Sequence, residues 1–165
     1  MSNERITKFN HIVGASPVGS DASKEEIWKQ LELQARLVLE EANEMYDAVK
    51  NKDIVEVLDG SIDVWYLREY MDDILKALNI DVAGAKYEVC FNNDQKYTTS
   101  EDLAMESWLE YVRQGKTPEV CSVDYEGKTY YTVKINGKVQ KLLHHVRPDL
   151  NKCIPEEIKE KLSGN

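Results

Sequence analysis

Several features that would indicate a membrane or secreted protein are missing from this sequence of 165 residues. No apolar run approaches the roughly 20 residues that a membrane-spanning helix needs. The polar opening MSNERITKFN lacks the apolar segment of a signal peptide. The three cysteines are widely spaced and form no Cys-x-x-Cys pair, which argues against a disulfide framework or a zinc knuckle. These absences predict a cytoplasmic protein with reduced thiols and no membrane partner.

Basic residues are also in short supply. Lys and Arg number 21 against 30 Asp and Glu, which gives a net charge of −9. A chain this acidic is poorly suited to the phosphate backbone of a nucleic acid. The sequence has no Gly-rich phosphate loop of the GxxxxGK[ST] kind and no nucleophile elbow, so a covalent mechanism is not indicated. The composition, 42% hydrophobic and 31% charged, is that of a globular protein.

The first two thirds of the chain carry helical signals. Ser23 and Glu26 have the spacing of a capping box, and apolar residues then recur every three or four positions to Val49. Asp53 is a suitable N-cap for a second long helix. We therefore predict helices over about 23–50, 53–79, 81–94 and 100–114, after an irregular lead-in over 1–21.

The last third alternates polar and apolar residues. Asn136-Gly137 is a typical two-residue hairpin turn, and the segment from Thr117 predicts a β-meander. The tail should be extended around Pro148, with a short helix after Pro155. The expected fold class is all-α with a small C-terminal β appendage. We expect a helical region over 1–116 and an appendage with its tail over 117–165, both in one domain.

Acidic residues interrupt the apolar turns of the first two long helices. Between residues 37 and 67 the only basic side chains are Lys50 and Lys52, both at the turn between the helices. Carboxylates from two helices suit Mg²⁺ or Mn²⁺, which in turn binds phosphate oxygens. The alternative is an ordinary solvated acidic face. The acids are Glu40, Glu41 and Glu44 on the first helix, and Glu56, Asp59 and Asp63 on one face of the second.

These acids resemble a known family pattern, EExxE on one helix followed by ExxD on the next. Here the two parts are Glu40-Glu41-Ala-Asn-Glu44 and Glu56-Val-Leu-Asp59. The pattern belongs to the all-α NTP pyrophosphohydrolase superfamily, of which MazG-like proteins are one branch. The segments FNHIVGASPV, VCFNNDQKYTTSE and RPDL are similar to elements of small phage-type members.

The resemblance implies an oligomeric antiparallel bundle of about four helices, active as a homodimer or homotetramer in a bacterial or phage-infected cell. It implies hydrolysis of a (deoxy)nucleoside triphosphate to the monophosphate and pyrophosphate, with Mg²⁺ and with water attacking the α-phosphorus. Glu40 and Glu41 would orient or deprotonate the water. The implied metal ligands are Glu41, Glu44, Glu56 and Asp59. In the alternative, the ligands from the second helix are Asp59 and Asp63, and Glu56 does not bind the metal directly.

Substrate contacts are expected at two further places. By resemblance, Asn92, Asn93 and Lys96 would contact sugar and phosphate, although Asn is also common at the C-terminus of a helix. His11 could hydrogen-bond the base and Trp28 could stack on it. The alternative is a histidine of the lead-in and a tryptophan at the edge of the core.

Other functions remain open on the sequence alone. A dUTP/dCTP-type or phosphoribosyl-ATP-type hydrolase of the same superfamily would carry the same acids. A non-catalytic helical module could instead dock a basic partner on its acidic face. The start of the second helix is apolar on most sides, which favours an oligomer over a monomer.

Overall fold

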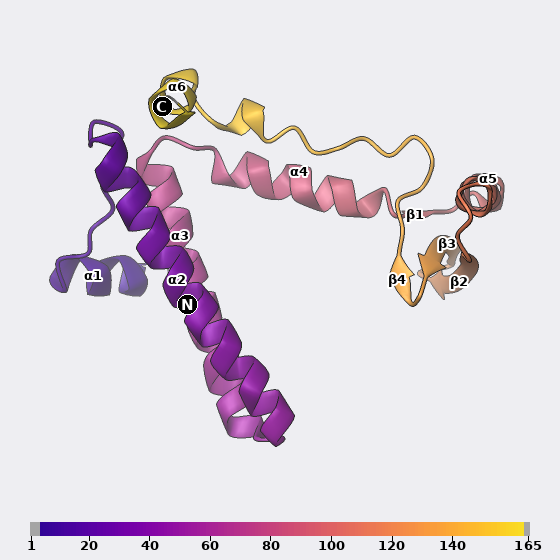
Figure 1. Ribbon diagram of the computed structural model, residues 1–165, viewed down its shortest axis with the longest axis horizontal. Coiled ribbons are helices and arrows are strands. Elements are labelled where there is room, and N and C mark those ends of the chain that lie inside the picture. Colours follow the sequence, from indigo (N-terminus) through magenta and orange to yellow (C-terminus); the bar gives the residue numbers. More distant parts are fainter. Residues whose placement is uncertain (1–3, 164–165) are drawn as a thin grey trace. The chain divides into compact units, whose positions relative to one another are not determined.

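The computed structural model describes residues 4–163 and is mostly helical, with a small antiparallel sheet (Figure 1). Within that range the α-helices are α1 (Glu4–Ile12), α2 (Lys24–Asn51), α3 (Ile54–Ala77), α4 (Val82–Asp94), α5 (Glu101–Arg113) and α6 (Glu156–Ser163). The strands are β1 (Tyr97–Thr98), β2 (Glu119–Tyr125), β3 (Lys128–Ile135) and β4 (Lys138–Val139), and a short 3₁₀ helix spans Asn151–Cys153.

The chain forms two compact units. The hairpin unit consists of the residues up to Val82 together with those from Asn151 onward, and the sheet unit runs from Ala83 to Leu150. The C-terminal segment returns to the first helices: the Asp81 amide donates to the Cys153 carbonyl oxygen at 2.8 Å, and Ile158 packs with Ile27 and Leu78.

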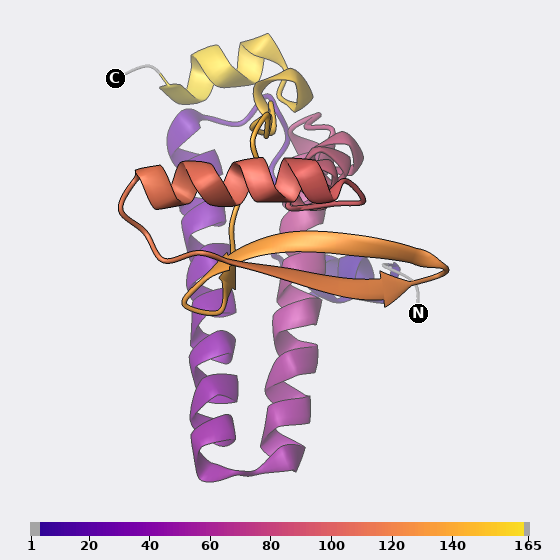
Figure 2. The same cartoon turned by 90° about the vertical axis from the view of Figure 1, so that its right-hand side faces the viewer.

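Helices α2 and α3 lie side by side as an antiparallel hairpin (Figures 1 and 2). The predicted capping box is confirmed, since the Ser23 hydroxyl accepts from the Glu26 amide at 3.2 Å and Glu26 accepts from the Ser23 amide at 2.9 Å. Asp53 caps α3 by accepting from the amides of Val55 and Glu56. These local signals place both helices within two residues of their predicted bounds.

The expectation of an irregular lead-in over 1–21 is wrong over Glu4–Ile12, where α1 forms. This helix buries Ile6, which packs against Tyr70 and Ile74 of α3. Nine residues are too few for a stable isolated helix. The contact with α3, more than 60 residues away in the sequence, therefore stabilises α1.

The hydroxyl of Tyr70 in this small core is buried and has no hydrogen-bond partner among the described residues. An unsatisfied buried polar atom costs about 1–3 kcal/mol. We expect Tyr70→Phe to raise the free energy of unfolding by about 1 kcal/mol. Chemical denaturation would measure this, with the exposed Tyr46→Phe as a control that changes nothing. A loss of stability in Tyr70→Phe would show that the hydroxyl is hydrogen-bonded in solution.

The sheet unit contains the predicted meander. Strand β3 pairs antiparallel with β2 along its length and with β4 across the Asn136-Gly137 turn, where both residues have positive φ. Strand β1, which the sequence did not predict, also pairs with β3. Figure 2 shows the β2–β3 hairpin running alongside α5, and the fully buried Ala104 and Val133 mark the core of this unit.

The predicted short helix after Pro155 is confirmed as α6. None of the helices in the described part of the chain combines the length and the apolar character needed to cross a membrane.

Candidate functional site

The two helices of the hairpin pack closely beside the predicted acidic site. Gly60 of α3 is buried, and a Cβ atom added there would lie 2.9 Å from Met45 Cβ and 3.1 Å from Met45 Cα. A glycine inside a helix costs about 1 kcal/mol relative to alanine. The close packing explains why it is present. The sequence marked this position only by its poor helix propensity, and the role of Gly60 as a packing contact was not foreseen.

Glu41 is the acid whose pKa is most clearly shifted by the other acids. Partial burial raises the pKa of its carboxyl above the ordinary value, and the negative charges of neighbouring acids raise this pKa further. Two of these neighbours, Glu44 and Glu40, lie on the same helix. The other two, Asp63 and Asp59, belong to α3. The hairpin thus brings carboxylates from both helices within electrostatic range of one another.

This arrangement bears on the two alternative sets of metal ligands. The α3 acids whose charges act on the pKa of Glu41 are Asp63 and Asp59, and Glu56 is not among them. Asp59 and Asp63 are one helical turn apart and share a face. Asp59 and Asp63 are thus the α3 acids within electrostatic range of Glu41, and the choice between the two ligand sets stays a prediction.

The acids do not converge into a preformed metal cage. Glu41 is partly buried, while the side chains of the other acids are exposed. Across residues 4–163 no group of three or more His, Cys, Asp or Glu side chains is arranged to hold a metal ion. The donor chemistry nevertheless fits Mg²⁺ or Mn²⁺, because these ions prefer carboxylate oxygens. Carboxylates that repel each other turn apart, and binding a cation would require rotation of their side chains.

The raised pKa of Glu41 leads to a stability prediction. A carboxyl with a higher pKa in the folded state binds more protons there than in the unfolded chain, so its contribution destabilises the fold as pH rises above the ordinary value. Without divalent cations, we expect Glu41→Gln to raise the melting temperature at pH 7.5 by at most about 3 °C, since solvent around this partly buried carboxyl screens the repulsion.

The same substitution should have little effect near pH 3, where the carboxyls are protonated in both states. Differential scanning calorimetry at the two pH values would measure the difference. Glu32→Gln, an exposed acid earlier on the same helix, is the control. A lower melting temperature for Glu41→Gln at pH 7.5 would contradict net repulsion at this site.

Residues Asn92, Asn93 and Lys96 belong to the sheet unit, at the end of α4 and just after it. The side-chain nitrogen of Asn92 lies 2.9 Å from His145 Nε2 and donates to the Val146 carbonyl oxygen at 2.9 Å. Asn92 therefore anchors the extended segment near residue 146. Lys96 Nζ donates to Asn93 Oδ1 at 2.6 Å. The roles of Asn92, Asn93 and Lys96 in contacting sugar and phosphate stay predictions.

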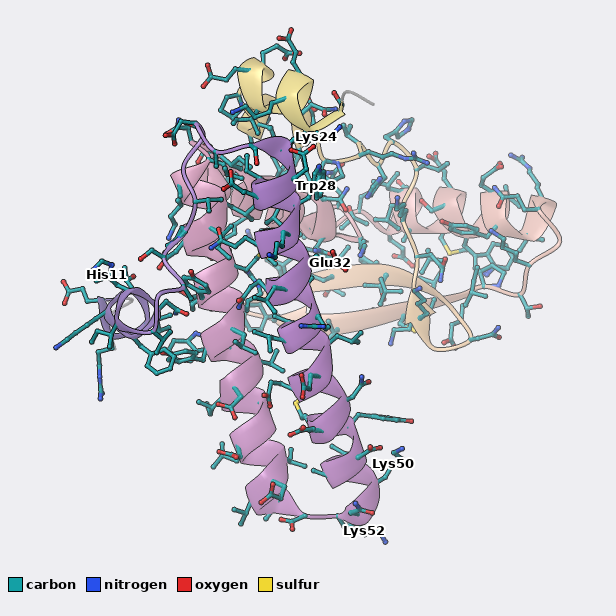
Figure 3. All side chains as sticks on the ribbon, turned by 60° about the vertical axis from the view of Figure 1, so that its left-hand side comes forward. His11, Lys24, Trp28, Glu32, Lys50 and Lys52 are labelled. Carbon is teal, nitrogen blue, oxygen red and sulfur yellow. The ribbon has the colours of Figure 1, made fainter. Side chains whose placement is uncertain are left out.

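The two residues expected to hold the base are both exposed and lie apart. His11 is on α1, where its Nδ1 lies 2.9 Å from Ser16 Oγ. Trp28 is on α2 and is 49% exposed. Figure 3 shows Trp28 between Lys24 and Glu32 along α2, with His11 on the other side of the hairpin. The structure does not bring these two side chains together.

Comparisons of the chain with family models, curated proteins and solved structures find no match. The resemblance to the pyrophosphohydrolases therefore rests on the motif residues alone.

Proposed function

We propose that this chain is a Mg²⁺-dependent nucleoside triphosphate pyrophosphohydrolase of the MazG-like kind. The observation that carries the proposal is the interaction of Glu41 with acids of both α2 and α3. In this proposal Glu41, Glu44, Asp59 and Asp63 hold the metal, and Glu56 lies farther from it. The bound ion would neutralise charge on the triphosphate.

The chemistry proposed for the chain's own residues is proton transfer and orientation of water. Glu40 or Glu41 accepts a proton from the water that attacks the α-phosphorus, and pyrophosphate leaves. The other of these two glutamates would orient the water.

The proposal includes a homodimer or homotetramer. In the single chain, the half of the α2–α3 hairpin next to its connecting turn exposes large apolar side chains. A second copy would cover them in a helical bundle. Light scattering of the purified protein would give the oligomeric state directly. The exposed residues are Leu39, Val49, Ile54, Val55, Leu58 and Ile62.

The experiment that tests the activity is pyrophosphate release from a panel of ribo- and deoxynucleoside triphosphates. The panel includes dUTP, dCTP and phosphoribosyl-ATP, because those substrates would assign the chain to another branch of the superfamily. We expect release with Mg²⁺ or Mn²⁺ and none with EDTA. Asp47→Ala is the matched control, since Asp47 lies on α2 beyond the motif and is ion-paired with Lys50.

A non-catalytic interaction module is the second candidate. It is favoured by the exposure of the acids and by the lack, within the described residues, of a group of them arranged around a metal position. This candidate predicts no pyrophosphate from any nucleotide and no rise in melting temperature with Mg²⁺. If both results were found with the correctly folded protein, the hydrolase proposal would be wrong.

A further inference from the structure

Strand β2 forms an open edge of the sheet. The order β1-β3-β2 gives β2 a single partner, and all seven of its residues pair with β3, from Glu119 opposite Lys134 to Tyr125 opposite Lys128. Among residues 4–163 no other strand pairs with β2. An edge strand presents unpaired backbone amides and carbonyls to any extended chain. Its sequence EVCSVDY contains neither the proline nor the lysine that commonly protects such edges.

A hollow lined by tyrosines opens beside this edge. The pairing of Val123 with Tyr130 and of Tyr97 with Thr132 puts these residues on the same face of the sheet. The rings of Tyr97 and Tyr130 meet edge to face with centroids 5.6 Å apart, and the centroids of Tyr125 and Tyr130 are 6.5 Å apart. The hollow has a volume of about 370 Å³ and is lined by Tyr97, Val123, Tyr125, Tyr130 and Thr132.

The residues of β2 that line the hollow are exposed to solvent. Val123 is 60% exposed and Tyr125 is 62% exposed, although both are large apolar or aromatic residues. Val133, on the opposite face of β3, is fully buried. One face of the sheet therefore forms the core of the unit, and the other offers an apolar surface beside unpaired backbone groups.

The charge of the edge indicates which chain would fit. Strand β2 carries Glu119 and Asp124 and no basic residue, and Glu126 follows in the turn. Lys134 of β3 lies opposite Glu119, whereas Asp124 lies opposite Thr129, whose hydroxyl donates to the Asp124 carboxylate at 2.7 Å. A second copy of β2 would bring further acids to an acidic edge, which like-charge repulsion disfavours. A basic segment would be attracted to it.

The alternating directions of the side chains along β2 indicate which positions of a docked peptide should be apolar and which should be basic. Val123 and Tyr125 point to the face with the hollow, so Asp124 between them points to the opposite face. A strand added next to β2 would place every second side chain over the hollow and the others near Asp124. Apolar side chains suit the first positions and basic side chains suit the second.

We propose that β2 is a docking edge for an extended peptide with alternating apolar and basic residues, which joins the sheet as a further strand and fills the tyrosine-lined hollow. Backbone hydrogen bonds would supply affinity, and the hollow together with Asp124 would supply selectivity. This interaction goes beyond the proposed hydrolysis, because it uses none of the acids or substrate contacts named in that proposal.

The probe for the first test is the acetylated and amidated peptide Lys-Val-Lys-Val-Lys-Val-Lys, titrated into the full chain by calorimetry. Two controls have Glu in place of every Lys, or Pro in place of the central Val. We expect the lysine peptide to bind at least about tenfold more tightly than either control, because the first loses attraction and the second loses a backbone donor. Amide hydrogen exchange in β2 should slow when the lysine peptide binds.

Two exposed positions of the edge allow matched variants. Asp124→Lys should weaken binding of the lysine peptide by about tenfold or more and strengthen binding of the glutamate peptide. Tyr125→Ala should weaken both. Tyr46→Ala removes an exposed tyrosine of α2 and should change neither.

Several outcomes would overturn the proposal. These are no binding of the lysine peptide, equal binding of the proline peptide, or binding of the lysine peptide that Asp124→Lys leaves unchanged. The last result would assign the binding to general attraction by the acidic chain. Slow amide exchange in β2 that depends on protein concentration without peptide would assign the edge to a second copy.

Discussion

Replacing Glu44 or Asp59 with alanine should lower kcat for pyrophosphate release by about 1000-fold or more, because each change removes a carboxylate from the proposed metal site. Both side chains are exposed, so the melting temperature should change little. Steady-state assays with the best nucleotide of the panel would measure the effect. Asp47→Ala, three residues beyond Glu44 on α2, should retain activity. Substantial turnover in either alanine variant would contradict the assignment.

A second pair of variants distinguishes the two alternative ligand sets. If Asp59 and Asp63 form the α3 pair, Asp63→Asn should lose about as much activity as Asp59→Ala, while Glu56→Gln should lose much less. The physical reason is that Asp63, and not Glu56, acts on the pKa of Glu41. Equal losses for Asp63→Asn and Glu56→Gln would place both residues at the site. A larger loss for Glu56→Gln would favour the original motif.

Gly60→Val should both destabilise the hairpin and abolish activity. The new side chain would collide with the backbone of Met45, since Met45 N and Cα lie only 3.2 Å and 3.1 Å from the position of an added Cβ. Overpacking of this kind costs about 1–3 kcal/mol, which corresponds to a melting temperature lower by roughly 2–12 °C. Separating the helices would also move Glu44 away from Asp59, since these acids are the chain neighbours of Met45 and Gly60.

Thermal unfolding and the pyrophosphate assay measure the two effects of Gly60→Val. Ser61→Val is the matched control, because it adds the same β-branched residue at the next, exposed position of α3. That control should cost no more than about 0.5 kcal/mol. If Gly60→Val had the stability and activity of Ser61→Val, the close approach of the helices would not be needed for either.

The elements that the sequence predicted well have their signals within a few residues of their ends. Ser23 with Glu26 and the single Asp53 each satisfy amides of the helix that follows, so the starts of α2 and α3 were predictable. Asn136-Gly137 likewise adopts positive φ locally and sets the β3–β4 turn. The spacing of Asp59 and Asp63, four positions apart, is by itself enough to place both acids on one face of a helix.

Other features depended on partners far away in the sequence. Strand β1 has two residues and exists because Tyr97 and Thr98 pair with β3, more than 30 positions later. Asn92 also has partners more than 50 positions later, because its amide binds the segment near Val146. No local pattern distinguishes these alternatives, because the energy that decides between them comes from contacts that form only in the folded chain.

The sequence by itself determined the long helices, the hairpin turns and the acidic character of the site, since each follows from interactions between residues a few positions apart. Only the tertiary structure decided that α1 is a helix, that Gly60 packs against Met45, and that Asp59 and Asp63 are the α3 acids that act on Glu41. Packing and electrostatic interaction between two helices depend on how those helices are placed, and spacing along one chain does not specify that placement.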